Sequence, residues 1–577
     1  MKKIILFLMI FVVTAVFLKA QIPIDEENSG FLKDISEQVR MFTDRNIYLS
    51  GEEVWFSIFV LVNNEPVALS KIIYVELFDE SKKKLNTGKF EVIMGKAAGS
   101  LTIPEEATSG TYYIRTYTRY QQNSSPNSFT SKTISIINPE FPLPNLEENS
   151  GTSAVGLSNS DETPVEINKM NEIHIVRDKN SYNKRQPVEL NITWPDTDFD
   201  EILGLSVSVA RQGTVDLFKL SSSEMYINDI GTENLAGDIF WIPETRGVSI
   251  SGFVQEKKSA KPMAGINVYL SVLGVDPQFH ISKTKENGAF VFSLGYIHGD
   301  HEIFVGVKQE NDEEIELLVN NDFSGEFPGM VKIPLAIDSS YKSLLEEMLV
   351  NQKSQTMFSK ELDIPIDTTV YGFDIFGSPD VSVYVSDYID LPNLETVFFE
   401  LVHTAMVREK EGQKTLYVVN PETNKVFSNQ LLMLDHVPVF NFENILNIPP
   451  SKIENIDVIN STHYLGDNTL KSVVMINTYA GDFAGYFFPE GSIFLEYQAI
   501  TPGKVIYSPI YENQSEINSR LPDFRTTLYW NPNISISDEE ATINFYTSDN
   551  TGKYDVIVRG ITKSGEVCFG RSSITIE

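Results

Sequence analysis

The chain has 577 residues, of which 42% are hydrophobic and 22% are charged, and its formal net charge at pH 7 is −33. This is the composition of an ordinary globular protein, and a prior of about 150 residues per domain predicts about four modules. The negative charge repels phosphate, which argues against nucleic acid or an anionic membrane surface as a partner. Because Cys568 is the only cysteine, the chain cannot form an internal disulfide and depends on core burial and sheet pairing.

The N-terminus is typical of a secretory signal. Two lysines precede an apolar run from Ile4 to Leu18, and Ala20 supplies a small residue at the expected cleavage point. The run is shorter than a membrane-spanning helix, which needs about 20 apolar residues, and no later stretch approaches that length. We therefore expect residues 1–20 to be a signal peptide. The mature protein is expected to have no transmembrane span and to be exported to the cell envelope, in the periplasm or associated with the outer membrane.

The first predicted domain covers residues 21–139. Short β-branched and aromatic runs, broken by Gly, Pro, Asn and Asp, are typical of an antiparallel sandwich, and the clearest strands are Val54–Val60, Ile72–Leu77 and Tyr112–Tyr117. Residues 140–168 are rich in Pro, Ser, Asn and acidic residues, which predicts a flexible linker.

After this linker the chain repeats a pattern of its first domain. The run Asp44–Tyr48, followed by Val54–Phe56, is echoed with the same internal spacing by Asp178–Tyr182, followed by Val188–Leu190. A further strand lies at a similar distance in each copy. This equal spacing predicts a second, related sandwich in residues 169–245.

A third sandwich is predicted in residues 246–335, where the Asn-Gly pair at Asn287–Gly288 separates two apolar alternations. Helices are expected only beyond it. Apolar residues at helical spacing predict one amphipathic helix over Ser339–Lys353 and a shorter one over Asn393–Val402, for which Asn393 is the N-cap. The segment 501–577 is predicted to be a C-terminal β-sandwich segment.

The first domain resembles the macroglobulin-like domain of the α-macroglobulin superfamily in Asp44-Arg45, Tyr48, Gly51-Glu52 and Val54–Phe56. The resemblance implies a seven-stranded sandwich in which Arg45 and Tyr48 are structural. The unit from Gly247 to Val307 resembles carboxypeptidase regulatory-like domains, which implies a transthyretin-type scaffold.

The most specific resemblance is to the plug domain of TonB-dependent receptors. It is carried by Leu432–Val439, Ile445–Ile459 and Val473–Thr478, with Tyr464-Leu465-Gly466 between the last two. We therefore assign residues 336–500 to a helix and a plug-like domain. Too few residues follow it for a receptor barrel of about 22 strands, so the chain is not expected to be a channel by itself.

This plug-like domain is the expected docking module. The resemblance implies that Asp435, Pro438, Tyr464 and Gly466 belong to the surface that meets another envelope protein. His436 departs from the family pattern, which usually has glycine at that position.

Residues 525–561 are similar to the sandwich that opens the C-terminal half of α-macroglobulins. That half continues into a thioester domain with a Cys-Gly-Glu-Gln run, which this sequence lacks. Together the resemblances imply a mainly β protein, in which tandem immunoglobulin-like or macroglobulin sandwiches accompany a small α+β plug-like domain.

Residues suited to catalysis have simpler structural explanations. His298, Asp300 and His301 could chelate zinc, but a turn explains them better because neither an HExxH helix nor a third distant ligand is evident. Asp435 beside His436 could form an acid–base pair, but we favour a turn carboxylate that accepts backbone hydrogen bonds. No nucleophile elbow, Walker loop or dinucleotide-binding glycine pattern occurs. We therefore predict that the protein is not an enzyme and has no catalytic residue, metal site or cofactor.

An aromatic stripe is the remaining candidate for ligand contact. Tyr112, Tyr113, Tyr117 and Tyr120 could face a glycan or a peptide, but alternation along a strand turns half of them inward, so we favour packing.

Two functions are compatible with these features. The first is a non-enzymatic envelope protein that docks to an outer-membrane or periplasmic protein and supports transport or assembly. The second is a degenerate macroglobulin-like protease trap without the thioester, with the linker at 140–168 as the segment to be cut. Both inferences rest on fold-level analogy, and the sequence does not set the oligomeric state.

Overall fold

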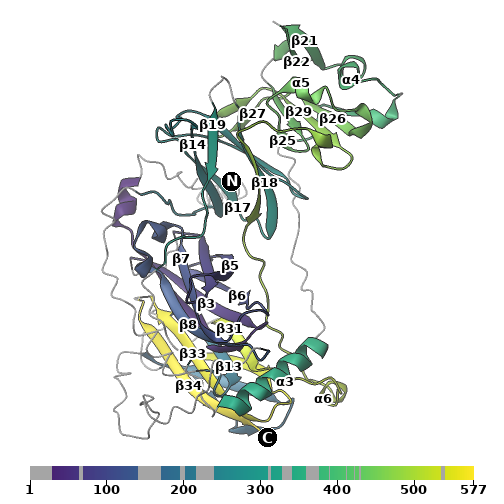
Figure 1. Cartoon of the computed structure of the whole chain (residues 1–577). Helices are drawn as coiled ribbons and strands as arrows, with labels where there is room; N and C mark the ends of the chain where they lie inside the picture. Colours follow the sequence, from purple (N-terminus) through teal and green to yellow (C-terminus); the bar gives the residue numbers. More distant parts are fainter. Residues whose placement is uncertain are drawn as a thin grey trace, which may run out of the picture.

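The computed structural model is mainly β and is organised as three sandwiches and a distal α+β unit (Figure 1). The predicted signal peptide and most of the predicted linker lie outside the described residues. The structure describes residues 29–63, 69–140, 171–194, 202–215, 239–308, 314–327, 335, 341–358, 376–388, 390–410, 412–421, 423–427, 430–534, 540–563 and 565–577.

The first sandwich packs a three-stranded sheet, in the order β1-β3-β6, on a five-stranded sheet, in the order β2-β8-β7-β4-β5. Alternating apolar residues such as Val54, Phe56 and Ile58 of β3 fill the space between the sheets. Its strands are β1 (Glu37–Thr43), β2 (Ile47–Leu49), β3 (Glu53–Val62), β4 (Ile72–Phe78), β5 (Lys84–Glu91), β6 (Lys96–Thr102), β7 (Gly110–Thr118) and β8 (Thr130–Ile137).

The tyrosine stripe belongs to the interior of this part of the molecule. Tyr112, Tyr113, Tyr117 and Tyr120 are all buried, which confirms the packing interpretation. Three short 3-10 helices accompany the first sandwich: η1 (Ser29–Asp34), η2 (Tyr120–Asn123) and η3 (Pro126–Ser128).

The second sandwich is assembled from two segments that are far apart in the chain. Its sheets have the orders β10-β12-β32 and β11-β34-β33-β13-β31, and the short β9 adds to β34. The first segment contributes β9 (Asn171–Glu172), β10 (His174–Arg177), β11 (Ser181–Tyr182), β12 (Pro187–Thr193) and β13 (Ile202–Arg211). The second segment contributes β31 (Thr527–Ile534), β32 (Glu540–Tyr546), β33 (Gly552–Thr562) and β34 (Val567–Ile576).

Strand for strand, the second sandwich repeats the first. If β1 to β8 are matched in chain order with β10, β11, β12, β13, β31, β32, β33 and β34, both sheet orders coincide. The parallel pairing of β2 with β8 also recurs, as the pairing of β11 with β34. The predicted tandem of related sandwiches is therefore present, but everything between the fourth and fifth strands of the second copy is an insertion.

This topology corrects two predicted boundaries. We expected a sandwich in 169–245 and a separate segment in 501–577, whereas β12 pairs with β32 along its whole length and β13 lies between β31 and β33. By itself, the first segment supplies only part of each of the two sheets, so the apolar faces of its strands would not be covered. The two segments therefore share one core, which includes Leu190, Val207 and Val558.

The third sandwich packs a sheet in the order β17-β14-β19 on a sheet in the order β16-β15-β18-β30. The expected hairpin at Asn287–Gly288 leads into β17, and Gly288 has the positive φ of 77° that such turns need. The edge strand β30 was assigned to the plug-like region of 336–500, but it pairs with β18 here. The strands are β14 (Val248–Glu256), β15 (Asn267–Val272), β16 (Gln278–Lys283), β17 (Ala289–Gly295), β18 (Asp300–Val307), β19 (Ile315–Val319) and β30 (Ser492–Gln498).

The distal unit, residues 376–488, is inserted between β19 and β30. A five-stranded sheet in the order β20-β26-β29-β24-β25 shares an apolar core with the helices α4 and α5 and with the small sheet β21-β22-β23. The strands β27 and β28 form a separate hairpin. Its strands are β20 (Val381–Tyr384), β21 (Ala405–Lys410), β22 (Gln413–Asn420), β23 (Lys425–Phe427), β24 (Leu431–Leu434), β25 (Val437–Pro438), β26 (Ile453–Ile459), β27 (His463–Leu465), β28 (Asn468–Leu470) and β29 (Val473–Thr478). Its helices are η6 (Val385–Asp387), α4 (Leu394–Glu400), α5 (Phe442–Ile445), η7 (Pro450–Lys452) and η8 (Phe483–Gly485).

The helix predicted at 339–353 is present as α3 (Lys342–Phe358), and the shorter predicted helix is α4, whose N-cap is Asn393 as expected. Although α3 precedes the distal unit in the chain, it lies at the opposite end of the molecule (Figure 1). There it buries Met348 against Ile47, Leu49 and Ile137 of the first sandwich.

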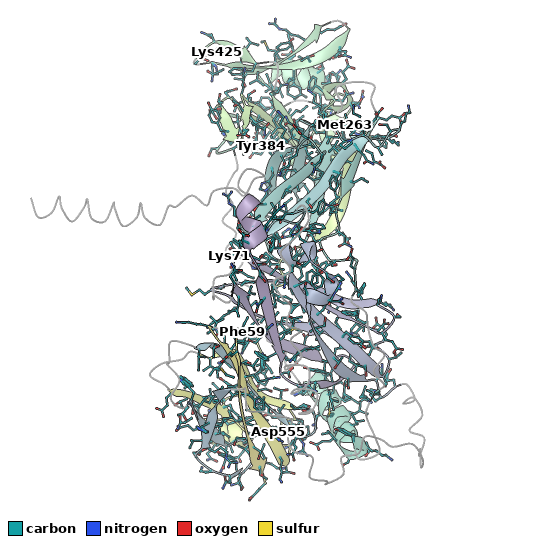
Figure 2. The ribbon with its side chains drawn as sticks, turned by 90° about the vertical axis from the view of Figure 1, so that its left-hand side faces the viewer. Phe59, Lys71, Met263, Tyr384, Lys425 and Asp555 are labelled. Carbon is teal, nitrogen blue, oxygen red and sulfur yellow. The ribbon has the colours of Figure 1, made fainter. Side chains whose placement is uncertain are left out.

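The units form an elongated stack. Figure 2 labels this order from Lys425 in the distal unit, through Met263 of the third sandwich and Phe59 of the first, to Asp555 of the second. After β30, the chain returns along the stack through residues 501–523, which include the short helix α6 (Gln514–Ile517).

Candidate docking surface

Asp435 lies in the tight turn between β24 and β25. Asp435 and His436 have φ values of 46° and 66°, so the turn uses two left-handed residues without a glycine. The Asp435 carboxylate accepts hydrogen bonds from Thr478 N and Thr478 Oγ1, both at 2.7 Å, and from Phe483 N at 2.9 Å. This confirms the interpretation of Asp435 as a turn carboxylate, and all three of these acceptor contacts stay within the distal unit.

Pro438 is the other predicted docking residue on this hairpin. It is buried, and it pairs with Met433 across β24 and β25. Asp435 and Pro438 therefore lie together inside the distal unit, where they shape the hairpin.

Tyr464 and Gly466 lie on a different hairpin, formed by β27 and β28. Tyr464 is 75% exposed, and Gly466 adopts a φ of 58° in the turn with no heavy atom near the position of a Cβ. The hairpin is anchored by Leu465 and Leu470, which pack against an apolar cluster shared with the third sandwich. It thus presents one aromatic ring on a supported base.

One face of the five-stranded sheet is covered by the third sandwich. Met433 and Met475 of the distal unit share an apolar cluster with Phe279, Tyr269 and Ile281. In addition, Ser271 Oγ donates a hydrogen bond to the carbonyl oxygen of His436 at 2.7 Å. The opposite face is covered by α4 and α5, so neither sheet face is free for a partner.

Exposed tyrosines gather at one end of the five-stranded sheet. Tyr384 ends β20, Tyr388 follows η6, and Tyr479 follows β29, and each is about half exposed. The pairing of β20, β26 and β29 brings these strand ends to the same end of the sheet. Tyrosine combines a large apolar area with a polar hydroxyl and is enriched in protein interfaces.

A buried cluster of four charges, which the sequence did not reveal, joins the first sandwich to the third. Lys89 Nζ lies 2.6 Å from Asp322 Oδ2, while Arg119 Nη1 lies 3.3 Å from Asp322 Oδ1 and 3.7 Å from Glu244 Oε1. Arg119 also donates to the carbonyl oxygen of Ser249 at 2.7 Å. Two cations meet two anions, so the junction buries charges that are paired.

The pKa values of the two acids in this cluster shift in opposite directions. Burial raises the pKa of Glu244 above its ordinary value, because the nearby Arg119 offsets only part of the desolvation. Burial also acts to raise the pKa of Asp322, but the charges of Lys89 and Arg119 outweigh it and lower this pKa. No local sequence signal could have found the cluster, since Lys89 and Asp322 are 233 residues apart.

The residues weighed for metal binding lie at the start of β18 and in the turn before it. His301 Nε2 lies 3.0 Å from the carbonyl oxygen of His298, which is a turn contact. Among the described residues, no group of three or more His, Cys, Asp or Glu side chains is arranged to hold a metal ion. Cys568 is buried in the core of the second sandwich.

No helix in the described part of the chain has both the length and the apolar character required to cross a membrane.

Comparison with known proteins supports the macroglobulin-type fold of the first sandwich. Residues 38–131 match the MG2 domain family. No curated protein matches the chain. With the shared strand order of the two sandwiches, this match defines a mainly β protein that contains macroglobulin-like domains.

Similar solved structures include two bacterial macroglobulins and an adhesin. Salmonella alpha-2-macroglobulin reacted with methylamine has 9% identity and a TM-score of 0.22, over 94% of this chain and 39% of that one. Escherichia coli alpha-2-macroglobulin activated by porcine elastase has 10% identity and a TM-score of 0.24, over 94% and 44%. The Escherichia coli adhesin FdeC has 13% identity and a TM-score of 0.14, over 50% and 65%. The chain thus spans less than half the length of these macroglobulins, and at such TM-scores the similarities carry no argument about function.

Proposed function

We propose that this chain is an exported, non-enzymatic docking protein of the cell envelope. In this proposal the sandwiches form a stiff stalk, and the plug-like distal unit carries the surface that meets an outer-membrane or periplasmic protein, in support of transport or assembly. The exposed Tyr464 on its anchored hairpin is the observation that carries the proposal.

The arrangement of the distal unit leaves exposed aromatic residues at both ends of its main sheet, whose two faces are covered within the chain. Tyr464 is exposed on the hairpin that leaves the sheet at Ile459 and Val473, and Tyr384, Tyr388 and Tyr479 are exposed at the other end. Aromatic side chains lose little conformational entropy on binding and bury a large area, so they are common anchors in protein interfaces.

Photo-crosslinking from the tip tests this role. A photoreactive amino acid is placed at Tyr464 in the full-length chain, and at Val176, which is exposed on the second sandwich, as the control. The proposal expects a discrete crosslinked protein in the envelope fraction from position 464 and none from position 176. The same products from both positions, or none from position 464, would contradict it.

A degenerate macroglobulin-like protease trap is the second candidate. It is favoured by the connection at residues 502–511, where Val505, Tyr507 and Ile510 are exposed and no strand pairing occurs. The linker predicted as the cut segment lies almost wholly outside the described residues. A trap should be cut at one place and then retain the protease, so gel filtration after incubation with elastase or chymotrypsin separates this function from docking.

A further inference from the structure

The outer face of β18 and β30 carries two unneutralised carboxylates in direct opposition. Glu302 on β18 pairs in register with Glu496 on β30, and both residues are exposed. Neither side chain has an ion-pair or hydrogen-bond partner among the described residues. Like charges directly opposite each other destabilise an antiparallel pair, so this arrangement works against folding.

An aromatic cluster lies on the same face, two residues after Glu302 on β18 and two residues before Glu496 on β30. Phe304 pairs with Phe494, and their ring centroids are 5.2 Å apart. Phe483 and Phe488 complete the cluster at 5.5 Å and 5.2 Å from the Phe494 ring. No cation lies over any of these four rings within the described structure. Phe494 keeps 36% of its surface exposed.

The backbone that brings Phe483 to this cluster is held in an unusual conformation. Phe483, Ala484 and Gly485 have consecutive φ values of 59°, 52° and 81°. Two non-glycine residues in this region cost stability, and such strain persists only where surrounding contacts hold it. Here Asp435 and Asp482 accept hydrogen bonds from the backbone N–H groups of Phe483 and Ala484.

β30 is also an edge strand. It pairs with β18 on one side, and no described strand pairs with its other side. The strand contains neither Pro nor Lys, the residues that often protect an edge from further pairing. Its C-terminal end meets the first sandwich: Tyr497 is buried, and the Gln498 side chain and Thr501 N, just beyond the strand, donate to the carbonyl oxygens of Thr87 and Lys89 in β5.

From these observations we propose that the free edge of β30, with the carboxylates of Glu302 and Glu496 and the phenylalanine cluster beside them, binds an extended basic segment of a partner protein. The segment adds as a strand along Ser492–Tyr497. A lysine or arginine opposite Glu496 neutralises the carboxylate pair, and an apolar residue two positions away packs on Phe494. Charge complementarity selects this occupant, since the chain carries a net charge of −33.

The proposal rests on the docking role but concerns a surface other than the Tyr464 hairpin. A metal ion fits the carboxylates less well than a basic side chain, because no three-ligand group is found among the described residues. Lysine and arginine also interact favourably with aromatic faces, which a hydrated metal ion would not use here.

Peptide binding to the full-length chain tests the proposal. The probe is a fluorescein-labelled ten-residue peptide, Lys-Thr-Phe-Thr-Lys-Thr-Phe-Thr-Lys-Thr, in which lysine and phenylalanine alternate along one face of the strand, and fluorescence anisotropy gives its Kd. We expect the double variant Glu302→Gln/Glu496→Gln to bind about fivefold more weakly, as befits partly exposed ion pairs. The matched control Glu106→Gln/Glu286→Gln removes two exposed carboxylates elsewhere and should bind like the original chain.

Two further peptides separate the contribution of charge from the contribution of backbone strand pairing. A peptide with glutamate in place of lysine should not bind. A peptide with N-methyl groups on alternate amides keeps its side chains but cannot pair as a strand, and it should also lose affinity. Equal binding by the double variant and the original chain, or full binding by either altered peptide, would overturn the proposal.

The folding of the double variant provides an independent check. Removal of the opposed charges should raise its denaturant midpoint above that of the original chain, because cross-strand repulsion is relieved. A lower midpoint would contradict the assignment of these carboxylates to binding rather than to stability. Peptide binding and crosslinking from position 464 use different surfaces, so failure of one is distinguishable from failure of the other.

Discussion

Tyr48 donates a hydrogen bond to Asp44 Oδ1 at 2.7 Å and to the carbonyl oxygen of Arg45, and Tyr182 makes the same contacts with Asp178 and Lys179. The predicted repeat is thus a repeat of one hydrogen-bonded loop. The two copies differ in burial, because the side chain of Asp44 is fully buried whereas that of Asp178 is one-third exposed.

This difference in burial predicts unequal effects of hydroxyl removal. Tyr48→Phe should lower the free energy of unfolding by about 2 kcal/mol, because the buried Asp44 carboxylate loses a hydrogen-bond donor. Tyr182→Phe should cost about 1 kcal/mol or less, because water can replace the hydroxyl at Asp178. Hydrogen exchange of the β2 and β11 amides measures the two losses separately. A larger loss in the second sandwich would refute the explanation by burial.

A raised pKa at Glu244 predicts a pH-dependent stability. The folded state keeps a proton on Glu244 above pH 4.5, where the unfolded chain releases it, so the stability from this group is present below pH 4.5 and is lost as pH rises through the folded pKa. Glu244→Gln cannot ionise, so its stability relative to the original chain should improve as pH rises from 4 to 8.

Denaturant unfolding at several pH values measures this difference. Glu286→Gln, at an exposed position, serves as the control and should track the original chain. A stability difference for Glu244→Gln that is independent of pH would show that Glu244 does not titrate in this range.

At the scale of single elements, α3 is predictable from its local sequence pattern, but it packs against strands that are distant in the chain. Its apolar residues recur at helical spacing, which makes the helix predictable, but its partners are strand residues of the first sandwich. Arg211 of the second sandwich adds an ion pair to Glu347 at 2.8 Å. The helix thus holds the two macroglobulin-type sandwiches together from one side.

Two methionines of α3 give a matched pair of substitutions. Met348 is 1% exposed, and Met348→Ala should cost about 3 kcal/mol through lost contacts and a cavity. Met357 is 78% exposed, so Met357→Ala should change stability by no more than about 0.5 kcal/mol. Denaturant unfolding and hydrogen exchange of α3 compare them, and similar effects at both positions would rule out the assigned packing.

At the scale of the whole molecule, the chain is a series of nested insertions. The second sandwich contains the third within its sequence, and the third contains the distal unit. Each insertion leaves its host after one strand and re-enters it at the host's next strand in chain order, so both ends of the inserted unit are tethered. Buried ion pairs also join the first sandwich to the third.

Nesting predicts that a cut in the connection between β30 and β31 does not release the C-terminal fragment. A recognition sequence for a site-specific protease is inserted in place of Tyr507. After cleavage, the two fragments should co-elute in gel filtration and separate only in denaturant. The reason is that β31 and β33 pair with β13, and β32 pairs with β12. Release of the fragment without denaturant would show that the second sandwich does not share one core.

Features set by neighbouring residues were predictable from the sequence. The Asp-x-x-x-Tyr loop, the Asn-Gly turn before β17, the Asn393 cap and the role of the Asp435 carboxylate all depend on short-range geometry. In the candidate site, the exposure of Tyr464 agrees with a docking surface, whereas Pro438 is buried. The docking role itself stays a prediction.

Only the tertiary structure decided which distant segments meet. β12 pairs with β32, and β13 pairs with β31 and β33, all more than 300 residues away, and an alternating strand can pair with many others of similar pattern. Likewise, Lys89 and Arg119 resemble surface residues in the sequence until burial pairs them with Asp322. The chain by itself determined the kinds of strand and turn, because these follow local periodicity and backbone preference. Long-range pairing followed from the burial of sheet faces, which depends on the whole fold.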